Sequence, residues 1–124
     1  MSKDKKIFIF DDNQELLELC TLILEDMGCV IKTSASAENV EGQLLAFMPQ
    51  LILMDNWIPG LSGIEATQKI KNNDQLKSIP VIYFSANSNI RDLAERAGAD
   101  DILAKPFDIA ALENMVKKYI SFED

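Results

Sequence analysis

Five short runs with strand character divide the chain, and each is followed by a segment with helical character. The runs cover residues 7–10, 29–33, 51–54, 81–84 and 102–104, and all except 29–33 are apolar throughout. The segments after them cover roughly residues 16–27, 37–47, 63–72, 90–97 and 108–119. Continuous apolar runs are typical of strands buried on both faces, as in parallel sheets. Because strand and helix alternate, the sequence predicts an α/β fold in which helices cover both faces of a doubly wound, five-stranded parallel sheet.

The length of 124 residues fits one domain, so we expect residues 1–124 to fold as a single unit. Lys and Arg total 12 against 20 Asp and Glu, which gives a formal net charge of −8. This charge disfavours direct binding to nucleic acid or to an anionic membrane, and it favours metal cations and basic protein surfaces as partners. The absence of histidine excludes a His-based catalytic dyad. No apolar run is long enough for a signal peptide or a membrane span, which predicts a cytoplasmic protein.

Polar residues of chemically useful types follow four of the predicted strands. They are Asp11 and Asp12 after the first, Asp55 after the third, Ser85 after the fourth and Lys105 after the fifth. Each residue alone has an ordinary explanation, such as a solvated turn, a helix cap or a surface lysine. The carboxyl ends of parallel strands lie along one edge of the sheet, where open α/β sheets hold their ligands. The sequence therefore predicts that these five residues converge into one site.

Three carboxylates and one amine form a site for a hard cation. Mg²⁺ is the expected occupant of Asp11, Asp12 and Asp55, because it prefers oxygen ligands and binds through one or two carboxylates together with phosphate oxygens. Without the metal, two carboxylates about 4 Å apart would repel each other by about 4 kcal/mol at an effective dielectric of ~20. We therefore expect at least one raised carboxyl pKa in the metal-free site.

Such a site can transfer a phosphoryl group. With the metal and Lys105 drawing charge off the phosphoryl group, a carboxylate can attack phosphorus and form an acyl phosphate. Asp55 is the expected nucleophile because it ends the central strand and the other residues flank it. Ser85 and the backbone N–H groups of Trp57 and Ala86 are expected to donate hydrogen bonds to the phosphoryl oxygens.

The chain strongly resembles the receiver domains of bacterial two-component response regulators, over about residues 5–119. The matching pieces are Phe10-Asp11-Asp12-Asn13, Met54-Asp55 with Pro59-Gly60 and Gly63, Ser85-Ala86, and Gly98-Ala99-Asp100-Asp101 with Lys105-Pro106-Phe107. The resemblance implies a flavodoxin-like sheet with strand order 2-1-3-4-5. It also implies a stand-alone signalling phosphoacceptor, similar to the chemotaxis regulators, that assists its own phosphorylation and dephosphorylation rather than acting as an enzyme on other substrates.

The resemblance further assigns residue roles and partners. Asp55 would accept the phosphoryl group from a sensor histidine kinase or a histidine phosphotransfer protein. Asp11 and Asp12 would hold Mg²⁺ with Asp55 and the backbone carbonyl of Trp57, and the Lys105–Pro106 peptide bond would be cis. The active form would contact a downstream protein, either as a monomer or as a phosphorylation-dependent dimer.

Three features depart from the family pattern. The family usually has Tyr or Phe at the position of Ile102, where the ring moves together with the hydroxyl at the position of Ser85. The loop at residues 87–89 is shorter than usual, and Trp57 is bulkier than the common choices. Trp57 would either shield an acyl phosphate from water or serve as packing.

The resemblance implies that the fourth helix, the fifth strand and the fifth helix carry the conformational change on phosphorylation. Arg91, Arg96 and Ile102 are the expected residues of the face that changes.

The sequence leaves three other functions open. The missing aromatic leaves room for a receiver-like interaction module that works without phosphorylation. A Mg²⁺-dependent aspartyl-phosphate phosphohydrolase is disfavoured because the chain has no cap domain and no second acid two residues after Asp55. A flavodoxin-like FMN carrier is less favoured than the phosphohydrolase, because no Gly/Ser/Thr-rich phosphate loop follows the first strand.

Overall fold

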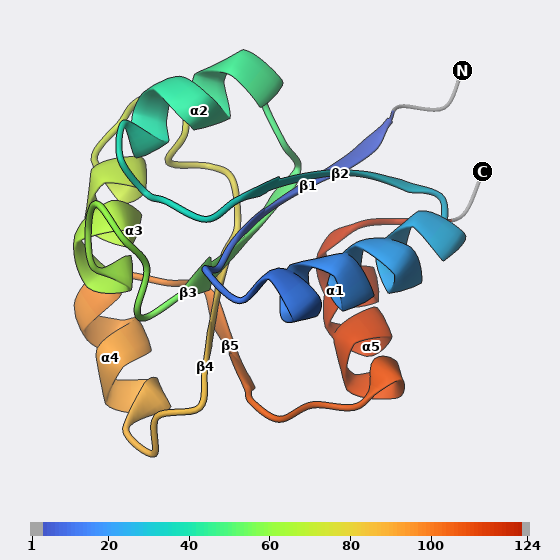
Figure 1. Ribbon diagram of the computed structural model, residues 1–124. Helices are drawn as coiled ribbons and strands as arrows, with labels where there is room; N and C mark the ends of the chain where they lie inside the picture. Colours follow the sequence, from blue (N-terminus) through green and yellow to red (C-terminus); the bar gives the residue numbers. More distant parts are fainter. Residues whose placement is uncertain (1–3, 123–124) are drawn as a thin grey trace.

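The computed structural model describes residues 4–122, in which strands and helices alternate from end to end (Figure 1). The strands are β1 (Lys5–Phe10), β2 (Cys29–Ser34), β3 (Leu51–Asp55), β4 (Val81–Ser85) and β5 (Asp101–Ala104). The helices are α1 (Gln14–Asp26), α2 (Val40–Phe47), α3 (Gly63–Lys71), α4 (Ile90–Ala97) and α5 (Ile109–Tyr119). No helix within residues 4–122 is both long enough and apolar enough to cross a membrane.

The strands form one parallel sheet in the order β2-β1-β3-β4-β5, which confirms the predicted topology. β3 lies between β1 and β4, and all five of its residues are buried. The register pairs Phe10 with Met54 and Asp55 with Phe84. The ends of these strands therefore lie side by side, with the end of β3 in the middle of the carboxyl edge.

Two cores, one on each face of the sheet, explain why the inner strands β3 and β4 are buried along their whole length. Successive strand residues point to opposite faces, so both faces of a doubly covered strand need apolar side chains. Phe8, Ile52 and Tyr83 pack in the core under α2, α3 and α4. Ile9 and Leu53 pack in the opposite core, under α1 and α5. Figure 1 shows the same division, with α1 and α5 together on one side of the sheet and the other three helices on the other.

Side-chain caps fix the start of three helices. Asn13, Ser62 and Asp108 each accept a hydrogen bond from a backbone N–H in the first turn of α1, α3 and α5, respectively. Such caps satisfy N–H groups that have no partner within the helix. Together these caps stabilise the first turns of the three helices that follow β1, β3 and β5.

The predicted start of α2 near residue 37 was wrong, because the helix begins at Val40. Ser36 forms a local turn in which its hydroxyl accepts from the N–H of Glu38, and Asn39 adopts the left-handed conformation with φ of 52°. The Ser36 hydroxyl also donates to the carbonyl of Pro59 at 3.1 Å, and the N–H of Ala37 donates to the same oxygen at 2.8 Å. This turn therefore binds the loop after β3 instead of extending the helix.

Candidate functional site

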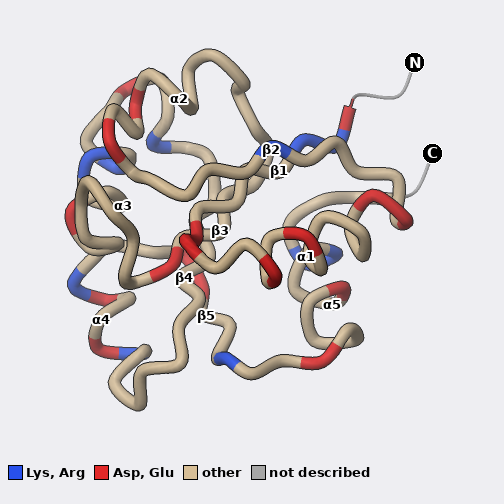
Figure 2. Tube along the Cα trace, in the orientation of Figure 1, with Lys and Arg blue, Asp and Glu red and all other residues tan. Residues whose placement is uncertain are grey.

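Four strand ends meet at the carboxyl edge of the sheet and bring the predicted site residues together. Asp11 follows β1, Asp55 ends β3, Ser85 ends β4 and Lys105 follows β5. The N–H of Lys105 donates to the carbonyl of Ser85 at 2.9 Å, which continues the strand pairing to the edge. In Figure 2, acidic segments that are far apart in the sequence meet near the middle of this edge. The predicted convergence is therefore present in the fold.

Asp11, Asp12 and Asp55 form a compact acidic cluster. One carboxylate oxygen from each residue lies within 4.8 Å of the corresponding oxygens of the other two. Asp11 and Asp55 are buried, with exposed fractions of 1% and 8%, whereas Asp12 is exposed to solvent. The N–H of Asn13 donates to Asp11 Oδ1 at 2.9 Å and holds that carboxylate in place. The oxygen donor set and its spacing fit a hard cation such as Mg²⁺ that enters from the solvent side.

Lys105 joins the two buried carboxylates. Its Nζ atom lies 2.6 Å from Asp11 Oδ2 and 3.1 Å from Asp55 Oδ1, and 4.5 Å from the centre of the Phe84 ring. The Lys105 side chain is only 19% exposed. Two buried negative charges require a paired positive charge at this place, because an unpaired buried charge is strongly unfavourable. The ammonium group is therefore fixed within contact distance of the Asp55 carboxylate.

The pKa of Asp55 is raised above its ordinary value. Burial is the largest cause, the negative charge of Asp11 adds to it, and Lys105 opposes both. The direction agrees with the expectation that carboxylate crowding in the metal-free site raises at least one pKa. A cation bound among the three carboxylates would favour the ionised form of Asp55.

Ser85 lies at the same edge and is buried, with an exposed fraction of 3%. Its hydroxyl oxygen accepts a hydrogen bond from the N–H of Asn87 at 3.1 Å, which ties Ser85 to the loop after β4. Trp57 and Ala86 follow the ends of β3 and β4 and are exposed. Trp57 is 74% exposed, so it does not pack in either core. This exposure leaves packing as the weaker of the two explanations for its size.

The Lys105–Pro106 peptide bond is cis, as the resemblance implied. Ile102 of β5, three residues before Lys105, is partly buried and packs against the core under α2, α3 and α4. Arg91 and Ile102 line an open groove of about 200 Å³ between α4 and β5. Arg96 is exposed on the same helix. Of the expected face residues, Arg91 and Ile102 therefore share this groove, whereas Arg96 does not line it.

Sequence reasoning missed Asn56 and Tyr83. The Tyr83 hydroxyl donates a hydrogen bond to the side-chain oxygen of Asn56, directly behind the acidic cluster. Both residues are buried. The only signal was a phenolic hydroxyl within a strand that is otherwise apolar, and its partner could not be identified without the fold.

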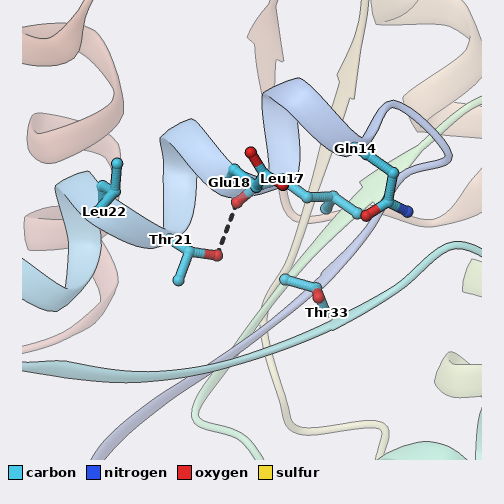
Figure 3. Close-up of a pocket in the computed structure, with 6 residues that line it drawn as sticks. All are labelled: Gln14, Leu17, Glu18, Thr21, Leu22 and Thr33. Atoms are coloured by element: carbon cyan, nitrogen blue, oxygen red, sulfur yellow. Dashed lines mark hydrogen bonds between the residues drawn. The ribbon is translucent and has the colours of Figure 1, made fainter.

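A second groove lies between α1 and β2 and has a volume of about 370 Å³ (Figure 3). Its lining residues are Gln14, Leu17, Glu18, Thr21, Leu22 and Thr33. The Thr21 hydroxyl donates to the carbonyl of Leu17, as the dashed line in Figure 3 shows. None of the strand-end residues lines this groove, so it is separate from the acidic cluster.

Comparison with curated proteins shows relatives of varied length. PilG of Pseudomonas aeruginosa is 28% identical over 93% of this chain and 87% of its own length. The CAI-1 autoinducer sensor kinase/phosphatase CqsS of Vibrio cholerae is 28% identical over 94% of this chain but only 18% of its own length. The chain spans about half the length of several other curated relatives. It therefore matches one module of these larger proteins.

Solved structures confirm the fold. The receiver domain of the sensor histidine kinase PA1611 from Pseudomonas aeruginosa, solved with a magnesium ion in its active-site cleft, is 26% identical with a TM-score of 0.86. The comparison covers 94% of this chain and 98% of that domain.

The family model for the response regulator receiver domain matches residues 7–117, which include the acidic cluster, Ser85 and Lys105. Receiver domains are the phosphoacceptor switches of two-component systems and are signalling modules rather than conventional enzymes. The match extends over most of the sequence and agrees with the strand order and with the convergence at the carboxyl edge. The chain belongs to the response regulator receiver domain family.

Proposed function

We propose that Asp55 accepts a phosphoryl group, in the presence of Mg²⁺, from the phosphohistidine of a sensor histidine kinase or a histidine phosphotransfer protein. The observation that carries this proposal is the position of Lys105 Nζ, which contacts both Asp11 and Asp55. A lysine bound to a buried acidic pair next to the exposed Asp12 supplies the charges that phosphoryl transfer needs.

The transfer step involves one carboxylate oxygen of Asp55. That oxygen forms a bond to phosphorus while the bond from phosphorus to the histidine nitrogen breaks, and the bonding electron pair leaves with the imidazole. Lys105 neutralises negative charge that builds up on the phosphoryl oxygens. Asp11, Asp12, Asp55 and the carbonyl of Trp57 would hold Mg²⁺, which when bound supplies further positive charge at those oxygens.

Ser85 and the backbone N–H groups of Trp57 and Ala86 complete the proposed phosphoryl site. Phosphorylation adds about 1.5 to 2 negative charges and three acceptor oxygens. The Ser85 hydroxyl would donate to one of these oxygens, and a movement of Ser85 toward Asp55 would change the bond that its oxygen accepts from Asn87 in the loop after β4. Reversing an inactive-to-active ratio of 99:1 needs ~5.5 kcal/mol of differential interaction. Charge-assisted hydrogen bonds of about 1.5–3 kcal/mol each can supply this amount.

We propose that Ser85 and Ile102 carry the switch to the groove between α4 and β5, where a downstream protein binds. In this proposal residues 1–124 act as one cytoplasmic receiver domain, as a monomer or as a dimer formed on phosphorylation. The net charge of −8 supports a protein partner with a basic surface over nucleic acid or a membrane.

We expect Asp12→Asn to weaken Mg²⁺ binding at least tenfold, because it removes the solvent-facing carboxylate of the cluster. Trp57, the only tryptophan of the chain, offers a fluorescence signal next to the site for a Mg²⁺ titration. Asp74→Asn is the matched control, since Asp74 is 94% exposed and pairs with Lys77 away from the cluster. Wild-type Mg²⁺ affinity in the Asp12 variant would remove Asp12 from the proposed ligand set.

The proposed function is tested by incubating the protein with Mg²⁺ and acetyl phosphate and weighing the intact protein. We expect a mass increase of one phosphoryl group that disappears when EDTA is added before the donor. Absence of any adduct would contradict the proposal and favour the phosphorylation-independent interaction module. Release of many equivalents of phosphate without an accumulating adduct would contradict it in favour of the phosphohydrolase.

A further inference from the structure

Tyr83 places a hydroxyl group inside the core under α2, α3 and α4. The residue is fully buried in β4, and its hydroxyl donates to the Asn56 side-chain oxygen. Burial, with a smaller contribution from the charge of Asp55, raises the pKa of Tyr83 to about 12. The phenol therefore remains a hydrogen-bond donor throughout the neutral range. A buried hydroxyl is tolerated only with a partner, so this pair specifies one arrangement of the two side chains.

Asn56 is the residue between Asp55 and Trp57, and it is held at two points. Its side chain accepts from Tyr83 of β4, and its backbone carbonyl accepts from the N–H of Gly63 at 3.0 Å. These two bonds connect the residue after the proposed phosphoacceptor to the neighbouring strand and to the first turn of α3. The backbone at residues 55–57 is therefore anchored from two directions.

The space around this anchor is tightly packed. A Cβ atom added at Gly63 would lie 2.2 Å from the backbone oxygen of Asp55 and 2.9 Å from the Tyr83 hydroxyl. These distances show that Gly63 lies directly against the backbone of residues 55 and 56 and close to the Tyr83 hydroxyl, where no larger residue fits. The end of β3, the start of α3 and the Tyr83 hydroxyl are therefore packed closely together.

Tyr83 also connects this anchor to the far strand of the sheet. The register places Tyr83 between Met54 of β3 and Ile102 of β5. Tyr83 belongs to the core under α2, α3 and α4, and Ile102 packs against that core. One buried side chain thus extends from beside Ile102 to Asn56.

We infer that Tyr83 is a positioning residue for phosphoryl transfer: its hydrogen bond to Asn56 fixes the backbone that carries Asp55 and Trp57. This inference rests on the proposed function of Asp55. It adds a requirement from the interior of the molecule, since neither Tyr83 nor Asn56 belongs to the proposed set that contacts the metal or the phosphoryl group. Preorganised geometry of this kind accelerates a reaction because the reacting groups need not be ordered during the step.

The experiment is a double-mutant cycle on the rate of phosphorylation by acetyl phosphate at saturating Mg²⁺. Tyr83→Phe removes only the hydroxyl oxygen, and Asn56→Ala removes its acceptor. We expect each variant to be phosphorylated about tenfold more slowly, which corresponds to about 1.4 kcal/mol of barrier. The double variant should be no slower than the slower single variant, because both changes remove the same bond.

Tyr119→Phe is the matched control, since Tyr119 is the other tyrosine of the chain and its hydroxyl donates to Asp101 at 2.7 Å away from the acidic cluster. Its rate should equal that of the wild type. A purely structural defect would lower the fraction of protein that can be phosphorylated, whereas a positioning defect lowers the rate and leaves the final stoichiometry at one. We therefore expect full stoichiometry in the Tyr83 and Asn56 variants.

Three outcomes would overturn the inference: a wild-type rate in Tyr83→Phe, additive effects in the double variant, or a loss of stoichiometry with an unchanged rate. Each of these presupposes an adduct in the wild type. A wild-type protein that forms no adduct would instead contradict the proposed function itself, so the two failures are distinguishable.

Discussion

Asp55→Asn should abolish phosphorylation while leaving the protein folded. The amide keeps an oxygen that can accept from Lys105 Nζ, which lies 3.1 Å from the Asp55 carboxylate, but the amide is a poor nucleophile toward phosphorus. We expect no phosphoryl adduct from acetyl phosphate with Mg²⁺, against one adduct in the wild type. Intact-protein mass spectrometry measures both.

The same variant should also be more stable than the wild type in the absence of Mg²⁺. The folded-state pKa of Asp55 is raised, mainly by burial, so the folded protein binds more protons than the unfolded chain between the two pKa values. The contribution of Asp55 to the free energy of unfolding therefore falls as pH rises through that interval. Replacing the carboxylate with a neutral amide removes this penalty above the raised pKa.

Thermal unfolding with EDTA at several pH values tests this consequence. The midpoint of Asp55→Asn should exceed that of the wild type at neutral pH, and the difference should shrink as the pH is lowered below the unfolded-state pKa. A variant that is less stable than the wild type at neutral pH would show that the Asp55 charge is favourable in the metal-free fold. A full adduct in the variant would show that Asp55 is not the acceptor.

Lys105→Met should reduce both the stability of the protein and its rate of phosphorylation. Asp11 is 1% exposed, and its Oδ2 atom lies 2.6 Å from Lys105 Nζ, so the substitution leaves a buried carboxylate without its cation. Breaking such a pair costs about 3 kcal/mol of unfolding free energy. Loss of a charged group that stabilises the phosphoryl oxygens should slow transfer about 100-fold. Urea unfolding and the rate of adduct formation measure the two effects separately.

Lys118→Met is the matched control for Lys105. Lys118 makes an ion pair of the same length, 2.6 Å, with Asp101, but its side chain is 62% exposed. The lysine end of this pair lies largely in solvent, although the Asp101 side chain is only 17% exposed, and the pair is remote from the acidic cluster. The control should therefore keep the wild-type rate of phosphorylation and lose less stability than Lys105→Met. Equal losses in the two lysine variants would show that the buried pair has no special role in stability or transfer.

Much of the site could be predicted from the sequence because strand ends are recognisable. Asp55 and Lys105 each follow an apolar run, and parallel strands place their carboxyl ends at one edge without any knowledge of side-chain contacts. The acidic cluster and the Asp55–Lys105 contact followed from this rule alone. The strand order could not be derived in this way, and it came from the family resemblance.

The sequence could not predict contacts that depend on how the loops pack. The start of α2 is delayed to Val40 because Ser36 and Ala37 bind the carbonyl of Pro59, more than 20 residues further along the chain. The bond from Tyr83 to Asn56 depends in the same way on the register of β3 and β4. Local spacing contains no information about either contact, since both are set by tertiary packing.

Phosphorylation at Asp55 is tested most sharply by identifying the residue that carries the phosphoryl group. After reaction with acetyl phosphate and Mg²⁺, borohydride reduction converts a phosphorylated aspartate into homoserine, which peptide mapping by tandem mass spectrometry can locate. We expect homoserine at position 55 alone. Homoserine at position 11 or 12, or at no aspartate of a protein that gained a phosphoryl group, would show that Asp55 is not the acceptor.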